Sequence, residues 1–324
     1  MAVMTYLEAI SDALRLAMRA DPAVILLGED IAAYGGAFKI TKGFLEEFGP
    51  RRVIDAPISE AAIVGASIGA ALVGLRPVAE MQFADFISNA FNQIVNIAAT
   101  SAYRAGGCVP IVVRAPCGAG THGGPFHSQS VEAYFFHAPG LKIVMPATPA
   151  DAKGLLLAAI ADPNPVLYLE HKALYRSQRG PVDEGLTFAP LGKAAVRRPG
   201  RDLTVVTYGM MVHRCCEAAE RAASEGVDAE VIDLRTLLPL DLEAVGASIE
   251  RTTRVLIVHE DRLRGGIGAE IAAHIGEQLF GSLDAPIARI GAPNIPVPYA
   301  PALEAAYLPS ADRIREAIVR LARW

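Results

Sequence analysis

The chain has 324 residues, 52% hydrophobic and 20% charged, with 30 basic against 35 acidic side chains and a formal net charge of −5. This composition excludes a disordered protein, and the mild acidity argues against nucleic acid as the main partner, because phosphate binding normally requires a basic face. Four cysteines, two of them adjacent at Cys215 and Cys216, do not make a disulfide framework and favour a reducing compartment.

The first residues predict a helix of the folded protein. Leu7, Ile10, Leu14 and Met18 recur at helical spacing among acidic residues, a pattern typical of an amphipathic helix and not of a secretion signal. The longest apolar run, 61–75, would form a helix about 22 Å long, short of the roughly 30 Å hydrocarbon layer of a membrane. Its glycines predict a buried helix that a neighbour approaches closely. We therefore expect a cytoplasmic protein without a membrane segment.

Short aliphatic runs then alternate with helical patterns, which is the order of elements in a parallel α/β sheet. The expected strands in this half are Val24–Leu27, Arg76–Glu80, Ile111–Arg114, Lys142–Val144 and Val166–Leu169. The expected helices between them are Glu60–Leu75, Phe86–Thr100 and Pro149–Ile160.

A polar, turn-rich segment at 175–190 contains few apolar residues, and a domain boundary is expected within it. A second α/β set follows, with expected strands at 203–208, 229–234, 255–259 and 286–291, helices at 212–225, after 241, from 268 and at 312–322, and a Pro-rich loop at 293–303. The sequence thus predicts two α/β domains, 1–182 and a smaller one at 183–324.

The segment Asp-Ala-Pro-Ile-Ser-Glu at 55–60 leads into the apolar helix. It is typical of an ordinary helix start, in which Ser59 is the N-cap and Glu60 stabilises the helix dipole by ~0.3–1 kcal/mol. Alternatively, the apolar residues after Glu60 would desolvate its carboxyl group and raise its proton affinity, so that it could share a proton with a ligand nitrogen. From these residues alone the helix start is favoured.

Aromatic residues follow the strand that ends at Glu80, in the segment Gln-Phe-Ala-Asp-Phe at 82–86. The carboxyl ends of parallel strands are where open α/β sheets bind ligands, and two aromatic side chains could enclose a planar ring. Phenylalanine is more often an ordinary core residue, so this segment alone decides nothing.

A glycine-rich loop at 116–130 contains four glycines between Gly118 and Gly124, which indicates unusual backbone conformations or a close approach. The histidines His122 and His127 do not form a zinc pattern with the neighbouring cysteines, because neither a paired-cysteine nor a paired-histidine spacing is present. A histidine in such a polar loop is as often an acid or base as it is structural, which makes His127 a candidate.

The segment 159–165 groups Asp162 and Asn164 with turn-forming prolines. Its composition favours a plain turn between a helix and a strand. A monovalent cation held by backbone carbonyls and these two side chains is the alternative, and the residues alone leave both open.

Taken together, several segments resemble one family, the β chains of the heteromeric, thiamine-diphosphate-dependent 2-oxo acid dehydrogenases of the pyruvate, branched-chain and acetoin types. The segments are DAPISE (55–60), EMQFADF (80–86), HSQS (127–130), PGLKIV (139–144), DAKGLL (151–156), NPVLYLEHK (164–172) and VIDLRTLLPLD (231–241). They occur in the family's order and spacing over nearly the whole chain.

This resemblance implies a transketolase-like α/β fold, with a parallel-sheet pyrimidine-binding domain followed by a smaller carboxy-terminal domain. It implies that Glu60 hydrogen bonds the aminopyrimidine nitrogen of thiamine diphosphate and so helps to activate the thiazolium carbon for attack on a 2-oxo acid. Phe86 would lie against the aminopyrimidine, with Gln82 and Ile58 nearby. His127 would assist transfer of the acyl group to lipoyl.

The resemblance also favours potassium over the plain turn at 159–165. Its implied ligands are the carbonyl groups of Ile111, Ala159 and Ile160 together with Asp162 and Asn164.

No Gly-Asp-Gly segment, which would hold the diphosphate through a metal ion, occurs in the chain. The resemblance therefore implies an α subunit that shares the thiamine diphosphate and supplies most of the Mg²⁺ site, in an α2β2 heterotetramer with a second β chain. It also implies docking of the lipoyl acyltransferase core near the chain end at Trp324.

The expected substrate is a small 2-oxo acid, branched-chain or pyruvate, and the segments around Phe83 and His127 favour the branched-chain class. An acetoin dehydrogenase β subunit and a non-catalytic transketolase-like scaffold are alternatives, although a scaffold would need neither Glu60 nor His127. A freestanding transketolase or NAD enzyme is disfavoured, because the glycine fingerprint at 265–271 is incomplete.

Overall fold

The computed structural model describes residues 1–324, which pack into two compact units. Unit 1 comprises 1–117 and 135–191, and unit 2 comprises 118–134 and 192–324. The segment 118–134, which contains the glycine-rich loop, therefore packs with unit 2 although it follows a strand of unit 1. The boundary expected between residues 182 and 183 lies at the end of a short strand of unit 1. The two units are described separately.

Unit 1 is built on a parallel sheet in the order β6-β7-β5-β4-β2-β3. These strands are β2 (Val24–Gly28), β3 (Val53–Asp55), β4 (Arg76–Glu80), β5 (Val112–Cys117), β6 (Lys142–Val144) and β7 (Val166–His171). Strand β5 is buried along its whole length, as expected for a central strand of a covered parallel sheet. The five strands predicted from aliphatic runs are thereby confirmed, and β3 is an addition.

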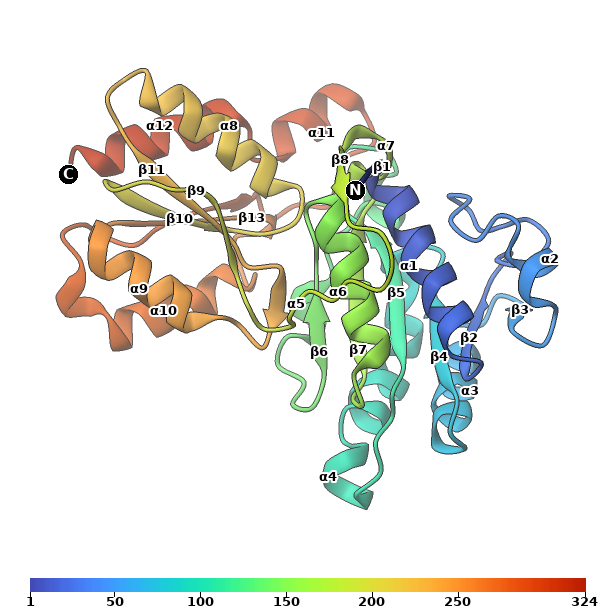
Figure 1. Cartoon of the computed structure of the whole chain (residues 1–324). Coiled ribbons are helices and arrows are strands. Elements are labelled where there is room, and N and C mark those ends of the chain that lie inside the picture. The colour runs from blue at the N-terminus through green and yellow to red at the C-terminus, as the bar shows by residue number, and fades with distance from the viewer. The chain divides into compact units, whose positions relative to one another are not determined.

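The helices of unit 1 include the predicted amphipathic one at the amino end. The elements are α1 (Tyr6–Ala20), α2 (Phe44–Phe48), α3 (Glu60–Leu72), η1 (Ala84–Ala90), η2 (Gln93–Ala98), α4 (Ser101–Ala105), α6 (Pro149–Ala161) and α7 (Leu174–Ser177), with α5 (Glu132–Phe135) at the junction with unit 2. Thr5 and Glu8 form a reciprocal capping box at the start of α1. Helices α1 and α6 lie side by side over the sheet (Figure 1).

Two predictions about unit 1 were wrong in detail, and one small sheet was missed. The single helix expected at 86–100 is instead a 3-10 segment, η1, followed by a π-helical segment, η2. Helix α3 is not buried all round, because Leu72 is 59% exposed, and a Cβ atom at Gly65 or Gly69 would meet no neighbouring atom. A two-stranded antiparallel sheet of β1 (Ala2–Thr5) and β8 (Arg179–Val182) was not predicted.

Unit 2 has its own sheet in the order β14-β13-β10-β11-β9, parallel except for β9 at one edge. Its strands are β9 (Ala195–Arg198), β10 (Leu203–Thr207), β11 (Ala229–Asp233), β13 (Val255–Arg262) and β14 (Ala288–Ala292). The short strand β12 (Thr236–Leu238) follows β11 in the chain and is not part of this sheet. Its helices are η3 (Gly124–Phe126), α8 (Met211–Ala223), α9 (Leu242–Thr252), α10 (Gly268–Gln278), η4 (Phe280–Ser282), α11 (Pro301–Tyr307) and α12 (Ala311–Ala322). Helices α8 and α12 cover one face of this sheet, and α9 and α10 lie on the other (Figure 1).

The predicted loop at 293–303 ends in helix α11, because Pro301 occupies the first helical turn, where its missing N–H is not needed. The other elements predicted for unit 2 are present with small shifts of their ends. None of the helices in the structure has the length and apolar character required to cross a membrane.

Candidate functional site

The carboxyl ends of three neighbouring strands meet at one edge of the sheet in unit 1. Gly28 is in register with Asp55 on one side and with Glu80 on the other, so β2, β3 and β4 end together. Glu29 follows β2 directly, and α3 begins at Glu60 shortly after β3. Open parallel sheets bind ligands at this edge, and most of the candidate residues lie beside it.

Glu60 is the first residue of α3 and is only 7% exposed. Its Oε2 atom accepts a hydrogen bond from the Asn89 amide, 3.1 Å away, which joins α3 to η1. Ser59 occupies the N-cap position, but its side chain makes no capping hydrogen bond. The ordinary helix-start interpretation therefore accounts for the location of Glu60 and not for the packing of its carboxyl group against an amide.

A second carboxyl group lies near Glu60 and was missed from the sequence. Glu29 is 8% exposed; burial raises its pKa above the ordinary value, and the negative charges of Glu60 and Asp30 raise it further. The available signal was its location directly after strand β2. A carboxyl group with a raised pKa, such as that of Glu29, can retain a proton, which is the property needed to protonate or deprotonate a ring nitrogen.

The segment 82–86 contributes aromatic and amide side chains and leads into η1, the element that also carries Asn89. Phe86 belongs to η1 and packs edge-on against Phe83, with ring centroids 6.2 Å apart. The Gln82 amide lies 3.5 Å from an Asp30 carboxylate oxygen. This combination of a carboxyl group, an aromatic face and an amide suits a flat heteroaromatic ring such as an aminopyrimidine.

Ile58 differs from the other candidates because its side chain is 83% exposed in the turn before α3. Its location near a ligand stays a prediction.

A buried charged network supports this edge from within the sheet. Arg114 of β5 donates to Glu80 of β4 at 2.6 Å and to both carboxylate oxygens of Glu170 of β7 at 2.6 and 2.9 Å. The Tyr175 hydroxyl donates to the same Glu170 at 2.7 Å. Burial raises the pKa of Glu80, which the Arg114 charge counteracts. The network fixes strand ends that carry the candidate site.

His127 follows η3 in unit 2 and is half-buried. The loop around it adopts left-handed conformations at Gly118, Gly120 and Gly124, which explains the glycines, and also at the non-glycine residue His122 (φ 60°). The Gly123 amide donates to the Ser128 hydroxyl at 3.1 Å and closes the turn that contains His127.

Three acidic residues, Glu132, Glu260 and Asp261, lie buried beneath this loop in unit 2. Burial, followed by the negative charge of Asp261, raises the pKa of Glu132 to about 8; burial likewise raises the pKa of Asp261 to about 6. Tyr208 donates to Glu132 at 2.9 Å, and the second Glu132 oxygen has no partner. Glu132 therefore retains a proton in the folded protein at neutral pH.

This buried acid predicts that stability declines as pH rises. Because the folded state binds a proton that the unfolded chain releases near its ordinary pKa of about 4.3, the unfolding free energy is highest at low pH and falls as pH rises through about 8. We expect the thermal midpoint of the wild type to fall between pH 5 and pH 8, and Glu132→Gln to flatten that slope. His259, whose pKa burial lowers to about 4, titrates below this window. A slope unchanged in the variant would contradict the assignment.

The candidate potassium ligands gather around the turn between α6 and β7. The Ile111 carbonyl accepts from the Val166 amide at 2.9 Å, and the Ala159 carbonyl accepts from the Asp162 amide at 3.3 Å. Asp162 also accepts from the Asn164 amide at 2.9 Å. Carbonyl oxygens have a second lone pair each, so this oxygen-rich set suits a hard monovalent cation.

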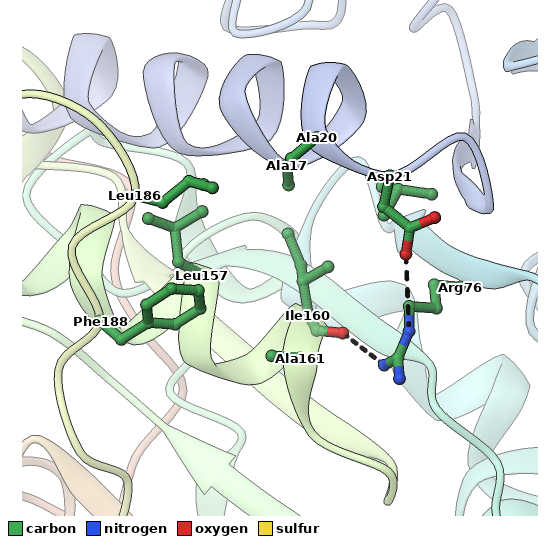
Figure 2. Close-up of a pocket in the computed structure, with 10 residues that line it drawn as sticks. Ala17, Ala20, Asp21, Arg76, Leu157, Ile160, Ala161, Leu186 and Phe188 are labelled. Atoms are coloured by element: carbon green, nitrogen blue, oxygen red, sulfur yellow. Dashed lines mark hydrogen bonds and ion pairs between the residues drawn. The ribbon is translucent and has the colours of Figure 1, made fainter.

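Two side chains of the protein already contribute positive charge to this turn. Arg76 donates to the Ile160 carbonyl at 2.9 Å and lies 3.8 Å from Asp21, as Figure 2 shows beside an apolar cavity of about 220 Å³. Lys142 forms an ion pair with the Asp162 carboxylate. A potassium ion would have to share these oxygens with both side chains.

Comparison with known proteins connects both units to one family. Residues 2–178 match the pyrimidine-binding domain of transketolase, and residues 192–314 match the transketolase C-terminal domain. The chain is 50% identical to the 2-oxoisovalerate dehydrogenase subunit beta of Bacillus subtilis over 100% of both chains. It is 46% identical to the acetoin:2,6-dichlorophenolindophenol oxidoreductase subunit beta of Cupriavidus necator, covering 95% of this chain and 94% of the relative. It is 42% identical to the pyruvate dehydrogenase E1 component subunit beta of Bacillus subtilis, covering 98% of each.

Among solved structures, a split-gene transketolase described as an inactive beta4 tetramer shares the fold, with a TM-score of 0.81 over 99% of this chain and 98% of that chain at 24% identity. The transketolase-like fold predicted from the sequence is confirmed. The chain belongs to the family of β subunits of the thiamine-diphosphate-dependent 2-oxo acid dehydrogenases.

Proposed function

We propose that this chain is the catalytic β subunit of a lipoamide-dependent branched-chain 2-oxo acid dehydrogenase and is active only with an α subunit. The main support is the buried Glu60 carboxyl group at the start of α3, held by Asn89 on the element that carries Phe86. The 50% identity to a 2-oxoisovalerate dehydrogenase subunit favours the branched-chain class over pyruvate.

In this proposal unit 1 binds and orients the aminopyrimidine ring. Glu60 shares a proton with a ring nitrogen, and the hydrogen bond from Asn89 keeps its carboxyl group in place for that transfer. Phe86 supplies an aromatic face, and Gln82 and Ile58 border the ring. When bound, thiamine diphosphate supplies the carbon nucleophile and accepts the electron pair that decarboxylation releases.

The overall reaction joins decarboxylation to reduction of a disulfide. The 2-oxo acid loses carbon dioxide, its two released electrons break the S–S bond of lipoyl, and the acyl group becomes a thioester on one sulfur while the other sulfur takes a proton. His127 would supply that proton or hold the leaving sulfur, which is the general-acid role that an imidazole fulfils near neutral pH.

The α subunit is needed because this chain has no side-chain group of its own that would bind the metal ion of the diphosphate. No group of three metal-ligating His, Cys, Asp or Glu side chains occurs in the structure, and no Gly-Asp-Gly segment occurs in the sequence. We infer that the α chain provides most of the Mg²⁺ site and shares thiamine diphosphate with β in an α2β2 assembly.

Further contacts with a second β chain and with the lipoyl acyltransferase core belong to the same proposal. Trp324, at the chain end, is 69% exposed and is our candidate for part of the acyltransferase docking surface. The cytoplasmic location stays a prediction.

The proposal is tested with the chain co-purified with its α partner, thiamine diphosphate and Mg²⁺. Dye reduction and acylation of a free lipoyl domain are measured with pyruvate, 2-oxobutanoate, the three branched-chain 2-oxo acids and acetoin. We expect the branched-chain acids to give the highest kcat/KM in both assays. Turnover of acetoin alone would assign the chain to the acetoin type, and an assembled complex without any turnover would favour a scaffold.

Potassium binding at the α6–β7 turn gives a separate prediction. A cation that binds only the folded state stabilises it by about 2.7 kcal/mol at a concentration 100 times its Kd, so the thermal midpoint of the assembled complex should rise in KCl above that in NaCl of equal ionic strength. Asp162→Ala, which removes a carboxylate ligand, should abolish the difference between the two salts. Equal midpoints in both salts for the wild type would show that Arg76 and Lys142 alone neutralise the turn.

A further inference from the structure

The histidine loop, residues 118–130, cannot hold its shape through its own hydrogen bonds alone. His122 adopts a left-handed backbone conformation (φ 60°) that is unfavourable for a residue with a side chain. Gly118, Gly120 and Gly124 have similarly positive φ values. A segment with so many uncommon backbone conformations requires contacts from elsewhere in unit 2.

Glu304 of helix α11 provides the first contact. The residue is only 1% exposed, yet its carboxylate binds the loop at two atoms of His122. One oxygen accepts from the His122 backbone amide at 3.2 Å, and the other lies 2.7 Å from the ring Nδ1 atom. This bidentate contact fixes the backbone and the imidazole of His122 together, and so stabilises the strained conformation.

Glu260 of strand β13 provides the second contact. It is 5% exposed and accepts from the Ala119 amide at 2.7 Å, and the Ser130 hydroxyl lies 3.5 Å from the same oxygen. One carboxylate oxygen therefore contacts both ends of the histidine loop. Ala119 is also buried in a small apolar cluster with four residues of the C-terminal domain, Ala292, Val297, Tyr307 and Leu308.

Tyr299 provides the third contact, which is steric. A Cβ atom at Gly124 would lie 2.3 Å from the Tyr299 ring, so the ring lies directly on the loop backbone and only glycine fits beneath it. Along the chain, His127 follows His122 and Gly124, which contact Glu304 and Tyr299, and precedes Ser130, which contacts Glu260.

We propose that Glu304 and Glu260 are positioning residues, which hold the histidine loop so that His127 is presented for acyl transfer to lipoyl. The inference rests on the proposed function of His127 and adds that the C-terminal domain organises the transfer step. The two carboxylates bind the loop at Ala119, His122 and Ser130.

These contacts would increase the rate of acyl transfer because they hold the loop in place before the reaction. A mobile loop would have to be ordered again in each transfer step, and a displacement of about 1 Å of a catalytic group can lower a rate about 10²-fold. Dye reduction differs from acyl transfer, because the dye accepts electrons without a leaving sulfur and needs no proton from His127. Damage to the loop should therefore separate the two assays.

The test compares the two assays in α2β2 complexes that carry Glu304→Ala or Glu304→Gln. Glu304→Ala is expected to lower the kcat of lipoyl-domain acylation about tenfold or more while dye reduction stays within about twofold. Glu304→Gln retains an acceptor for the His122 amide and a group that can pair with Nδ1, so most of the acylation rate should return. Hydrogen exchange of the amides at 119–128 should accelerate in the alanine variant and not in the glutamine variant.

His122→Ala keeps the test informative if Glu304→Ala does not fold, because the His122 side chain is 52% exposed and its removal leaves the core intact. It removes the ring contact with Glu304 and keeps the backbone amide contact, so it should reproduce part of the selective loss of acylation. Combining it with Glu304→Ala should add little to the loss in Glu304→Ala, which already removes both contacts. The matched control is Glu230→Gln, a 5% exposed carboxylate of unit 2 that binds Arg251 and not the loop. It should leave the ratio of the two rates unchanged.

The outcomes distinguish the inference from the function on which it rests. A wild-type complex that neither reduces dye nor acylates lipoyl overturns the proposed function. A wild type active in both assays, with Glu304→Ala and His122→Ala lowering both rates equally or neither, overturns the positioning role and leaves the function standing.

Discussion

Glu60→Gln is expected to lower dye-reduction kcat of the assembled enzyme with any accepted 2-oxo acid by about 10²–10⁴-fold, the usual contribution of a positioned acid or base. Glutamine has the shape of glutamate and can still accept the Asn89 hydrogen bond, but it cannot take or release a proton. The KM for the 2-oxo acid and the affinity for thiamine diphosphate should change far less, because the ring's flat faces still meet Phe86 and Gln82.

Two further variants are compared with Glu60→Gln. Glu46→Gln, at an exposed position of α2, removes a similar charge from unit 1 away from the strand edge and should retain wild-type kcat. Asn89→Ala releases the Glu60 carboxylate without changing its chemistry and should produce an intermediate loss. A Glu60→Gln enzyme that keeps more than about a third of wild-type kcat would rule out proton transfer at this residue.

Local patterns in the sequence predicted most of the sheets but missed elements that depend on distant partners. Strand β1 forms only because Ala2–Thr5 pairs with Arg179–Val182, far along the chain, and neither run shows strand periodicity. Strand β3 is three residues long, too short for an alternating pattern. Helix α11 begins inside the predicted Pro-rich loop at 293–303, because its single proline, Pro301, is favourable in a first helical turn.

The residues of the candidate site also divide into those that a sequence pattern identified and those that depend on distant contacts. Glu60, Phe86 and His127 were found because their segments resemble a known family. Glu29 was missed although it directly follows strand β2. Asn89 and Glu304 were missed because nothing local marks them: Asn89 matters through Glu60, and Glu304 through His122, which lies 182 positions away in the chain. The fold makes these residues neighbours, and only the structure reveals them. Where each predicted residue acts in catalysis remains a prediction for the experiments above.

The second large effect is expected in stability, at the charged network behind the strand edge. Arg114 is 1% exposed and compensates two buried carboxylates, Glu80 and Glu170. Arg114→Met leaves both in the interior without a counter-charge, which is expected to lower the unfolding free energy by about 3–5 kcal/mol. Urea denaturation of the complex at pH 7.5, about three units above the ordinary glutamate pKa of about 4.3, measures the loss through the midpoint and slope.

A triple variant distinguishes uncompensated charge from lost packing as the cause of the lower unfolding free energy. If uncompensated charge is responsible, the triple variant Arg114→Met, Glu80→Gln, Glu170→Gln should recover most of the stability, because it removes the charges while keeping the side-chain volumes. The single variant should also recover part of its loss as pH falls toward 5, since Glu80, whose pKa burial raises and which then lacks the Arg114 charge, takes up a proton. A single variant destabilised by less than about 1 kcal/mol would mean that water already reaches the network, and that β4 and β7 hold the site edge without it.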